Sequence, residues 1–299
     1  MGTEQLKVKK GANLKQPVET GSSRGSKTGG WSRANIHHVG QDQISEGAQD
    51  PDFMTSLARG LSVIQVFTPT SPRMTPSQIS GETRLSRAAV RRCLYTLRLL
   101  GFVEVEETNQ FSLSHRVLTL GHAYTSSSRL PRAAQPILEK LSGLLHESCS
   151  VATLVDDELL YVARAHVSRI MKVDLAIGSR LPAYCTSMGR VLLAHLPPTQ
   201  LDRYFQSVRL QKHTSRTITS EARLRKVLEG VKSLGYAVVD QELEDGLRSV
   251  AVPVRGVGGE VVAALNTGAQ SIRIPVEEIE NRVLHHLLAA AANLSKALQ

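Results

Sequence analysis

The stretch LSRAAVRRCLYTLRLLGF, residues 85–102, decides the fold of the first half of this 299-residue chain. Placed at 100° per residue, its apolar side chains form a stripe roughly 120° wide, which predicts a helix packed by one face. The stretch contains no Asp or Glu. The stripe consists of Val90, Cys93, Leu94, Leu97 and Leu100, and the other side carries Arg87, Arg91, Arg92 and Arg98.

The segments around this helix predict a winged helix-turn-helix. Apolar residues from Met54 to Phe67 recur at helical spacing, and Thr-Pro-Ser-Gln at 75–78 has the form of a capping box with proline at the first helical position. We expect helices over about 52–67 and 75–83, and a third that is capped by Ser86 and ends at Gly101. Residues 102–113, FVEVEETNQFSL, then predict two short strands joined by a turn.

A recognition helix in the major groove needs a capped N-terminus, an apolar back and hydrogen-bond donors near the start of its outer face. Residues 85–102 meet these requirements, and the planar guanidinium group of arginine suits both guanine and phosphate. The alternative is a solvated charged face, but ordinary exposed helices mix both signs of charge. We therefore predict binding to double-stranded DNA through Thr75, Ser77, Ser86, Arg87, Ala88, Arg91, Arg92 and Tyr95.

The composition agrees with a polyanion partner. The formal net charge is +9, and the excess is spread along the chain, with the stretch quoted above as the one place where positive charge is concentrated. Cys93, Cys149 and Cys185 lie too far apart in the sequence for a metal-binding motif or a paired disulfide framework. No apolar run approaches the length of a membrane span, and the N-terminus lacks the apolar segment of a signal peptide. We expect a cytoplasmic protein that uses no cofactor and no metal.

The chain divides into four predicted parts. Residues 1–50 are rich in Gly, Ser, Lys and Gln without periodicity, so we expect a disordered tail in which Trp31, His37 and His38 are solvated rather than part of a site. Residues 51–113 form the winged helix-turn-helix, 114–130 a linker helix, and 131–299 a second domain. The apolar side chains of the linker, Val117, Leu118 and Tyr124, would join the domains or pair two subunits.

The second domain alternates helices and strands, and RGVGGEV at 255–261 is a hairpin turn rather than a phosphate loop because no helix follows it. Helices are expected at 132–147, 187–196, 198–206, 220–234 and 275–297. Strands are expected near 149–155, 159–165, 169–175, 236–240, 247–255 and 260–267.

Four segments carry a resemblance to a known family. MTPSQISGETRLSRAAVRRCLYTLRLLGFV (74–103) resembles the helix-turn-helix of the IclR family of bacterial transcription regulators. GSRLPAYCTSMGRVLLAHLP (178–197), GYAVVDQELEDGLRSVAVPVRG (235–256) and VVAALNTGA (261–269) are similar to the effector domain of that family. The resemblance extends over about 53–297. It implies an α+β fold, in which the winged helix-turn-helix is joined by a linker helix to a GAF-like or profilin-like effector-binding domain with a curved antiparallel sheet.

LPAYCTSMGRVLLA and ALN further resemble the branch of the family that regulates breakdown of protocatechuate and 4-hydroxybenzoate. This implies an effector that is a small aromatic or keto carboxylic acid. It also implies a homodimer or a dimer of dimers that binds an inverted repeat of operator DNA in the bacterial cytoplasm. One position departs from the family, because Arg84 stands in the turn where the family usually has glycine.

The predicted effector site combines a local argument with the resemblance. Ser187 and Met188 begin a predicted helix, where free N–H groups and the helix dipole can hold a carboxylate. Tyr184 could stack on a ring or donate a hydrogen bond. The apolar members could equally be simple core, and an arginine at 164, 169, 180 or 248 could pair with the carboxylate. The resemblance adds Leu181, Asp240, Leu247, Ser249, Leu265 and Thr267, with Val239 as a rival to Asp240.

Two other classes of function remain as alternatives. An enzyme would use Cys185 or Ser187 as nucleophile with His195 nearby, but neither a Gly-x-Ser-x-Gly motif nor a histidine-bearing signature accompanies them, so we predict that the chain is not an enzyme. A sensor could instead act by protein contact, with the winged helix as a dimerisation module. The acidic residues at 240–245 are better explained by a solvated loop than by a metal site.

Overall fold

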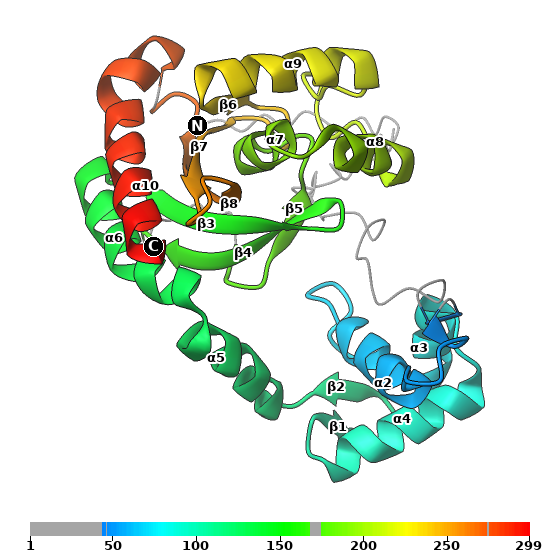
Figure 1. The fold of residues 1–299 in the computed structure, drawn as a ribbon. Helices are drawn as coiled ribbons and strands as arrows, with labels where there is room; N and C mark the ends of the chain where they lie inside the picture. Colours follow the sequence, from blue (N-terminus) through cyan, green and yellow to red (C-terminus); the bar gives the residue numbers. More distant parts are fainter. Residues whose placement is uncertain (1–43, 46, 168–174, 274) are drawn as a thin grey trace, which may run out of the picture. The chain divides into compact units, whose positions relative to one another are not determined.

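The structure is a computed structural model that describes residues 44–45, 47–167, 175–273 and 275–299 (Figure 1). Most of the predicted tail, with Trp31, His37 and His38, lies outside the described residues. The predicted strand at 169–175 also lies outside them apart from Leu175, and so does Arg169.

The first part of the described chain has the predicted order of elements. Helices α2 (Thr55–Gln65), α3 (Pro76–Thr83) and α4 (Arg87–Leu99) are followed by the hairpin of β1 (Val103–Val105) and β2 (Phe111–Leu113). The capping box of α3 is confirmed, because the Thr75 N–H donates to Gln78 Oε1 at 2.8 Å and the Gln78 N–H donates to Thr75 Oγ1 at 3.3 Å. The winged helix-turn-helix prediction is therefore confirmed.

The turn between α3 and α4 is built without glycine. Arg84 caps α3 in the left-handed conformation at φ 56°, which costs a non-glycine residue some free energy. The next residue, Leu85, is buried in the core of this unit. The structure thus keeps the expected turn and places the left-handed residue at Arg84, where the family usually has glycine.

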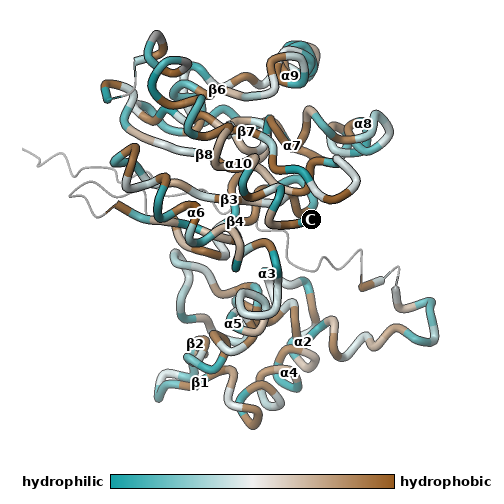
Figure 2. The backbone as a smooth tube through the Cα atoms, turned by 60° about the vertical axis from the view of Figure 1, so that its left-hand side comes forward, coloured by the Kyte–Doolittle hydropathy of each residue, from teal (hydrophilic) through white to brown (hydrophobic). Residues whose placement is uncertain are grey.

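Helix α4 packs on α2 and α3 through the predicted stripe, with one correction. Val90, Leu94 and Leu97 are buried, but Leu100 is 52% exposed. The helix ends at Leu99, and Gly101 takes φ 76° to turn the chain, so Leu100 is the C-cap at the edge of the predicted stripe and no further helical turn follows it. Figure 2 shows the alternation of hydrophobic and hydrophilic segments along α4.

The predicted linker helix is interrupted. A 3-10 turn (His115–Val117) leads into α5 (Leu118–Ser127), and Ser128 is extended before α6 (Arg129–Leu145) begins. No residue of α5 is buried, and Leu118 and Tyr124 are exposed.

The second part is built on a six-stranded antiparallel sheet in the order β5-β4-β3-β8-β7-β6. Five of its strands were predicted, and β5 was missed because it has only three residues. The bounds are β3 (Ser148–Val155), β4 (Glu158–Ala165), β5 (Arg180–Pro182), β6 (Ala237–Asp240), β7 (Leu247–Arg255) and β8 (Val261–Gln270).

Helices cover both faces of this sheet (Figure 1). On one face, α6 and α10 (His285–Leu298) enclose a core that includes Val250 and Leu265. Residues 276–284, which precede α10, form a 3-10 turn and a π-helix rather than the start of one continuous helix. On the other face, α7 (Ser187–Ala194), α8 (Pro198–Ser207) and α9 (Glu221–Leu234) enclose a second core. The α+β fold class with an antiparallel sheet is confirmed.

Candidate functional site

The outer face of α4 is an exposed cluster of positive charge. Arg87, Arg91, Arg92 and Arg98 are all exposed, and none of their guanidinium groups forms an ion pair with a carboxylate of the described residues. Ser86 caps the helix by accepting a hydrogen bond from the Ala89 N–H at 3.2 Å. This geometry presents free donors near the capped start of a firmly packed helix, as major-groove recognition requires.

The other predicted DNA-binding residues lie around this cluster. Ala88 and Tyr95 are exposed on α4, with Tyr95 66% accessible, and Ser77 is exposed in the first turn of α3. The Thr75 hydroxyl is engaged in the capping box. The hairpin differs in charge, because Glu104, Glu106 and Glu107 are all exposed on it. The positive charge of this unit therefore concentrates on α4 rather than on the wing.

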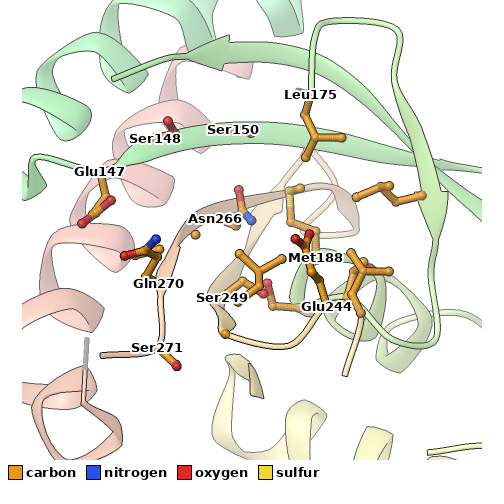
Figure 3. Close-up of a pocket in the computed structure, with 18 of the residues that line it drawn as sticks. Glu147, Ser148, Ser150, Leu175, Met188, Glu244, Ser249, Asn266, Gln270 and Ser271 are labelled. Atoms are coloured by element: carbon orange, nitrogen blue, oxygen red, sulfur yellow. The ribbon is translucent and has the colours of Figure 1, made fainter. Parts of the chain in front are cut away.

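A cavity of about 690 Å³ opens on the α7 side of the sheet (Figure 3). Its wall combines apolar side chains from α7 and the loop after β6 with hydroxyl, amide and charged groups from β3, β4, β7 and β8. Figure 3 shows Met188 of α7, Ser249 of β7 and Asn266 of β8 around the same space. This mixture of an apolar wall with a few convergent polar groups is typical of a small-molecule site.

The start of α7 faces this cavity. Thr186 caps the helix, and its oxygens accept from the N–H groups of Gly189 at 3.3 Å and Arg190 at 3.0 Å. The N–H groups of Ser187 and Met188 are left at the helix start. The Ser187 side chain is 1% exposed, and its Oγ has no hydrogen-bond partner in the described part of the chain. A ligand with an acceptor group would satisfy these donors.

Helix α7 is buried and packs closely against the segment that precedes it in the same chain. All eight of its residues are buried. A Cβ on Gly189 would collide with the backbone of Ala183, so only glycine allows this approach.

The predicted effector residues divide into two groups. Five of them line the cavity, namely Leu181, Ser187, Met188, Leu247 and Ser249. Leu265 and Thr267 share a face of β8 as expected, but it is the opposite face: Leu265 packs in the core beneath α6 and α10, and the Thr267 hydroxyl donates to the Ser148 carbonyl at 3.2 Å. Because strand side chains alternate, Asn266 and Gly268 take the cavity positions instead.

Tyr184 and Asp240 do not reach the cavity. The Tyr184 hydroxyl donates to the Gln211 carbonyl at 2.8 Å and lies 2.9 Å from His213 Nε2, which fixes it behind α7. Asp240 is neutralised by Arg248, at 2.8 Å, and by Arg216. Val239, the rival to Asp240, is buried and does not line the cavity either.

The arginines that were candidates for pairing with the effector carboxylate differ in whether they already have a carboxylate partner. Arg180 pairs with Glu158 at 2.7 Å and Arg248 pairs with Asp240, so both already have carboxylate partners. Arg164 lines the cavity and donates to Ser150 Oγ at 3.0 Å.

Sequence reasoning missed a buried ion pair beside the cavity. Arg190 on α7 and Glu242 pair at 2.7 Å with side chains only 3% and 9% exposed, and Glu242 also accepts from the Ile218 N–H at 3.0 Å. Glu242 is thus not part of a solvated loop as predicted, whereas Glu244 and Asp245 are exposed and line the cavity. The pair ties α7 to the 241–246 loop, and its partners are 52 residues apart in the sequence, beyond any local pattern.

The cysteine of the enzyme alternative is unsuited to nucleophilic chemistry. Cys185 is fully buried, and this burial raises the pKa of its thiol to about 12. His195 Nδ1 lies 2.8 Å from the Val191 carbonyl at the far end of α7. Neither residue lines the cavity.

Comparison with known families and proteins agrees with this geometry. Residues 56–107 match the IclR helix-turn-helix domain, and residues 122–296 match the model described as "Bacterial transcriptional regulator IclR C-terminal". The Pca regulon regulatory protein of Pseudomonas putida is 50% identical over 250 residues, which span 83% of this chain and 86% of that protein. No helix of the described residues has the length and apolarity to span a membrane.

Solved structures agree as well. A protein of Rhodococcus sp. RHA1, described as a transcriptional regulator, has a TM-score of 0.72 at 46% identity over 82% of this chain and 98% of its own. An IclR homologue of Microbacterium hydrocarbonoxydans in complex with 4-hydroxybenzoate has a TM-score of 0.68 at 26% identity over 81% of this chain and 98% of its own. The family consists of transcription regulators rather than enzymes, in agreement with the prediction. The chain belongs to the IclR family of bacterial transcription regulators.

Proposed function

We propose that this regulator binds operator DNA through α4 and that a small aromatic carboxylic acid, such as 4-hydroxybenzoate or protocatechuate, controls that binding. The single observation that carries the proposal is the cavity at the start of α7, where the first N–H groups of the helix and the Ser187 hydroxyl, which has no hydrogen-bond partner among the described residues, suit a carboxylate. The complex of the Microbacterium homologue with 4-hydroxybenzoate supports the choice of acid.

In this proposal residues 51–113 bind DNA, 114–130 link the two parts, and 131–299 bind the effector and contribute to oligomer contacts. The DNA contacts are Ser77, Ser86, Arg87, Ala88, Arg91, Arg92 and Tyr95, with Thr75 positioned at the start of α3. The effector contacts are the five predicted residues that line the cavity. Leu265, Thr267, Tyr184 and Asp240 would act only through packing, hydrogen bonds or ion pairs within the protein.

We also propose that the chain acts in the bacterial cytoplasm as a homodimer or a dimer of dimers on an inverted repeat. The exposed apolar side chains of α5, Leu118, Leu120 and Tyr124, support a contact between subunits. Analytical ultracentrifugation would test it: a monomer at micromolar concentration would contradict the proposal, and an even-numbered oligomer would support it.

An operator selection tests the DNA-binding half. The purified chain is used to select duplexes from a random-sequence library, and the enriched sequences should form an inverted repeat. Thermal-shift measurements with protocatechuate and 4-hydroxybenzoate test the other half, because a ligand that binds only the folded state raises its stability. To act as a switch, the acid must then change the affinity of the protein for the selected duplex. It can do so only if it binds the DNA-binding conformation and the other conformation with different affinities.

If the chain instead acts by protein contact, no duplex will be enriched even at low salt. Flat thermal shifts across the acids with normal DNA selection would leave the regulator in place and overturn the aromatic effector.

A further inference from the structure

We propose that Arg164 is a specificity-determining residue of the effector cavity, which it makes selective for an anion over a neutral molecule of the same shape. This inference rests on the proposed function, because it concerns the ligand of the same cavity. The N–H groups and the Ser187 hydroxyl at the start of α7 require only a hydrogen-bond acceptor, which can be charged or neutral. Arg164 adds a preference for negative charge.

A β-bulge aims Arg164 into the cavity. In the pairing of β3 with β4, Val151 pairs with Ala163, but the next residue, Ala152, pairs with Tyr161, so β4 contains one extra residue at Val162. Tyr161 and Arg164, three positions apart, consequently both line the cavity, whereas regular alternation would have turned Arg164 to the α6 side. Bulges commonly re-aim a side chain beside a functional site.

The guanidinium group of Arg164 has no counter-charge in the described residues. One terminal nitrogen donates to Ser150 Oγ at 3.0 Å, whereas Nε is buried and has no hydrogen-bond partner there. Burial lowers its pKa, and the titratable groups that oppose this effect are the Tyr161 hydroxyl and the Cys149 thiol, not a carboxylate. Arginine nevertheless keeps its charge in proteins.

The carboxylates that line the cavity do not neutralise Arg164. Glu147 pairs with Arg273 at 2.9 Å, and Glu244 and Asp245 are exposed, where water screens them. A partly buried cation without a partner is unfavourable in the empty protein. The incoming carboxylate of an effector would supply the missing partner, and charge-assisted hydrogen bonds are among the strongest in proteins.

The first experiment compares 4-hydroxybenzoate with 4-hydroxybenzamide, which has the same shape and no charge, by isothermal titration calorimetry. The unmodified chain should prefer the acid by about 10-fold to 100-fold. Arg164→Gln should lose most of this preference with little change in the affinity for the amide, and Arg164→Lys should retain it. Arg255→Gln, on β7 outside the cavity, is the matched control and should leave the ratio unchanged.

A second experiment needs no ligand. If Arg164 is retained for binding rather than for folding, Arg164→Met should leave the melting temperature of the empty protein unchanged or raise it by roughly 1–3 °C.

If the Arg164→Gln variant still prefers the acid over the amide, the proposal is overturned. A melting temperature of the Arg164→Met variant that is lower by more than about 5 °C would also overturn it. If neither compound binds the unmodified chain, the aromatic effector of the proposed function fails, and the melting temperature still decides the role of Arg164.

Discussion

Among the residues that the structure describes, the arginines of α4 and Arg164 of β4 have no carboxylate partner, and they lie in two different environments. On α4 the guanidinium groups lie in water, where an unpaired charge costs little free energy. On β4 the guanidinium group of Arg164 is partly enclosed in the wall of a cavity, where a charge without a partner is unfavourable. The comparison suggests that the exposed cluster recognises an extended polyanion and that the enclosed group recognises one small anion.

The largest expected effect comes from removing the exposed cluster. Arg87→Ala with Arg91→Ala should weaken binding to the selected duplex by roughly 100-fold or more, because each contact to a base or a phosphate contributes about 1–3 kcal/mol. Fluorescence anisotropy measures this. Arg98→Ala, at the far end of the same helix, is the matched control and should cost less than about tenfold. Loss of effector binding in the folded double variant would contradict the separation of the two sites.

A smaller effect is expected from the buried pair beside the cavity. Glu242→Gln leaves the Arg190 guanidinium charged and buried without its partner, and it should lower the free energy of unfolding by about 3 kcal/mol. Urea denaturation measures this change. The exposed pair of Glu221 with Arg225 is the control, because Glu221→Gln should cost no more than about 0.5 kcal/mol. Equal losses in the two variants would mean that the 241–246 loop does not hold α7 in place.

The start of α7 allows a finer comparison between neighbours. The Ser187 hydroxyl has no partner in the described part of the chain, so Ser187→Ala should leave the stability unchanged and weaken 4-hydroxybenzoate roughly fivefold, as expected for one hydrogen bond. Thr186→Ala instead removes the helix cap and should cost about 1 kcal/mol of stability. Calorimetry and urea denaturation separate the two effects. A loss of stability in Ser187→Ala would show that its hydroxyl acts in folding.

The Cys185 thiol should react very slowly with alkylating reagents in the folded protein. Since its pKa is raised to about 12, almost no thiolate exists at pH 8, and iodoacetamide should modify it at least about 100-fold more slowly than in the urea-unfolded chain. Reactivity should increase only as the pH approaches 12. Mass spectrometry after timed quenching gives both rates, and rapid labelling of the folded protein would contradict the burial of the Cys185 thiol.

The sequence predicts the elements better than the cavity. Helical periodicity and capping residues locate α3 and α4 because their causes lie within a few residues. The exception, Leu100, stands where the periodicity ends. The faces of the strands depend on register, so Leu265 and Thr267 were assigned to the wrong side of β8, and Asn266 was missed within an apolar strand.

Arg164 could not be selected from the four candidate arginines by sequence. Its direction depends on the bulge at Val162, which alternation alone does not reveal. Its charge balance depends on where distant carboxylates lie, since Arg180 and Arg248 pair with carboxylates and Arg164 pairs with none of those in the described part of the chain.

One measurement tests the central comparison most directly: the affinities for the selected duplex and for 4-hydroxybenzoate, determined on the same protein across a series of salt concentrations. Exposed arginines on phosphates release counterions, so duplex affinity should fall by roughly 100-fold or more between about 50 and 200 mM salt. Effector affinity should change by less than about threefold, because an enclosed ion pair is weakly screened. Duplex binding that does not depend on salt, or effector binding that falls in parallel with it, would contradict the account.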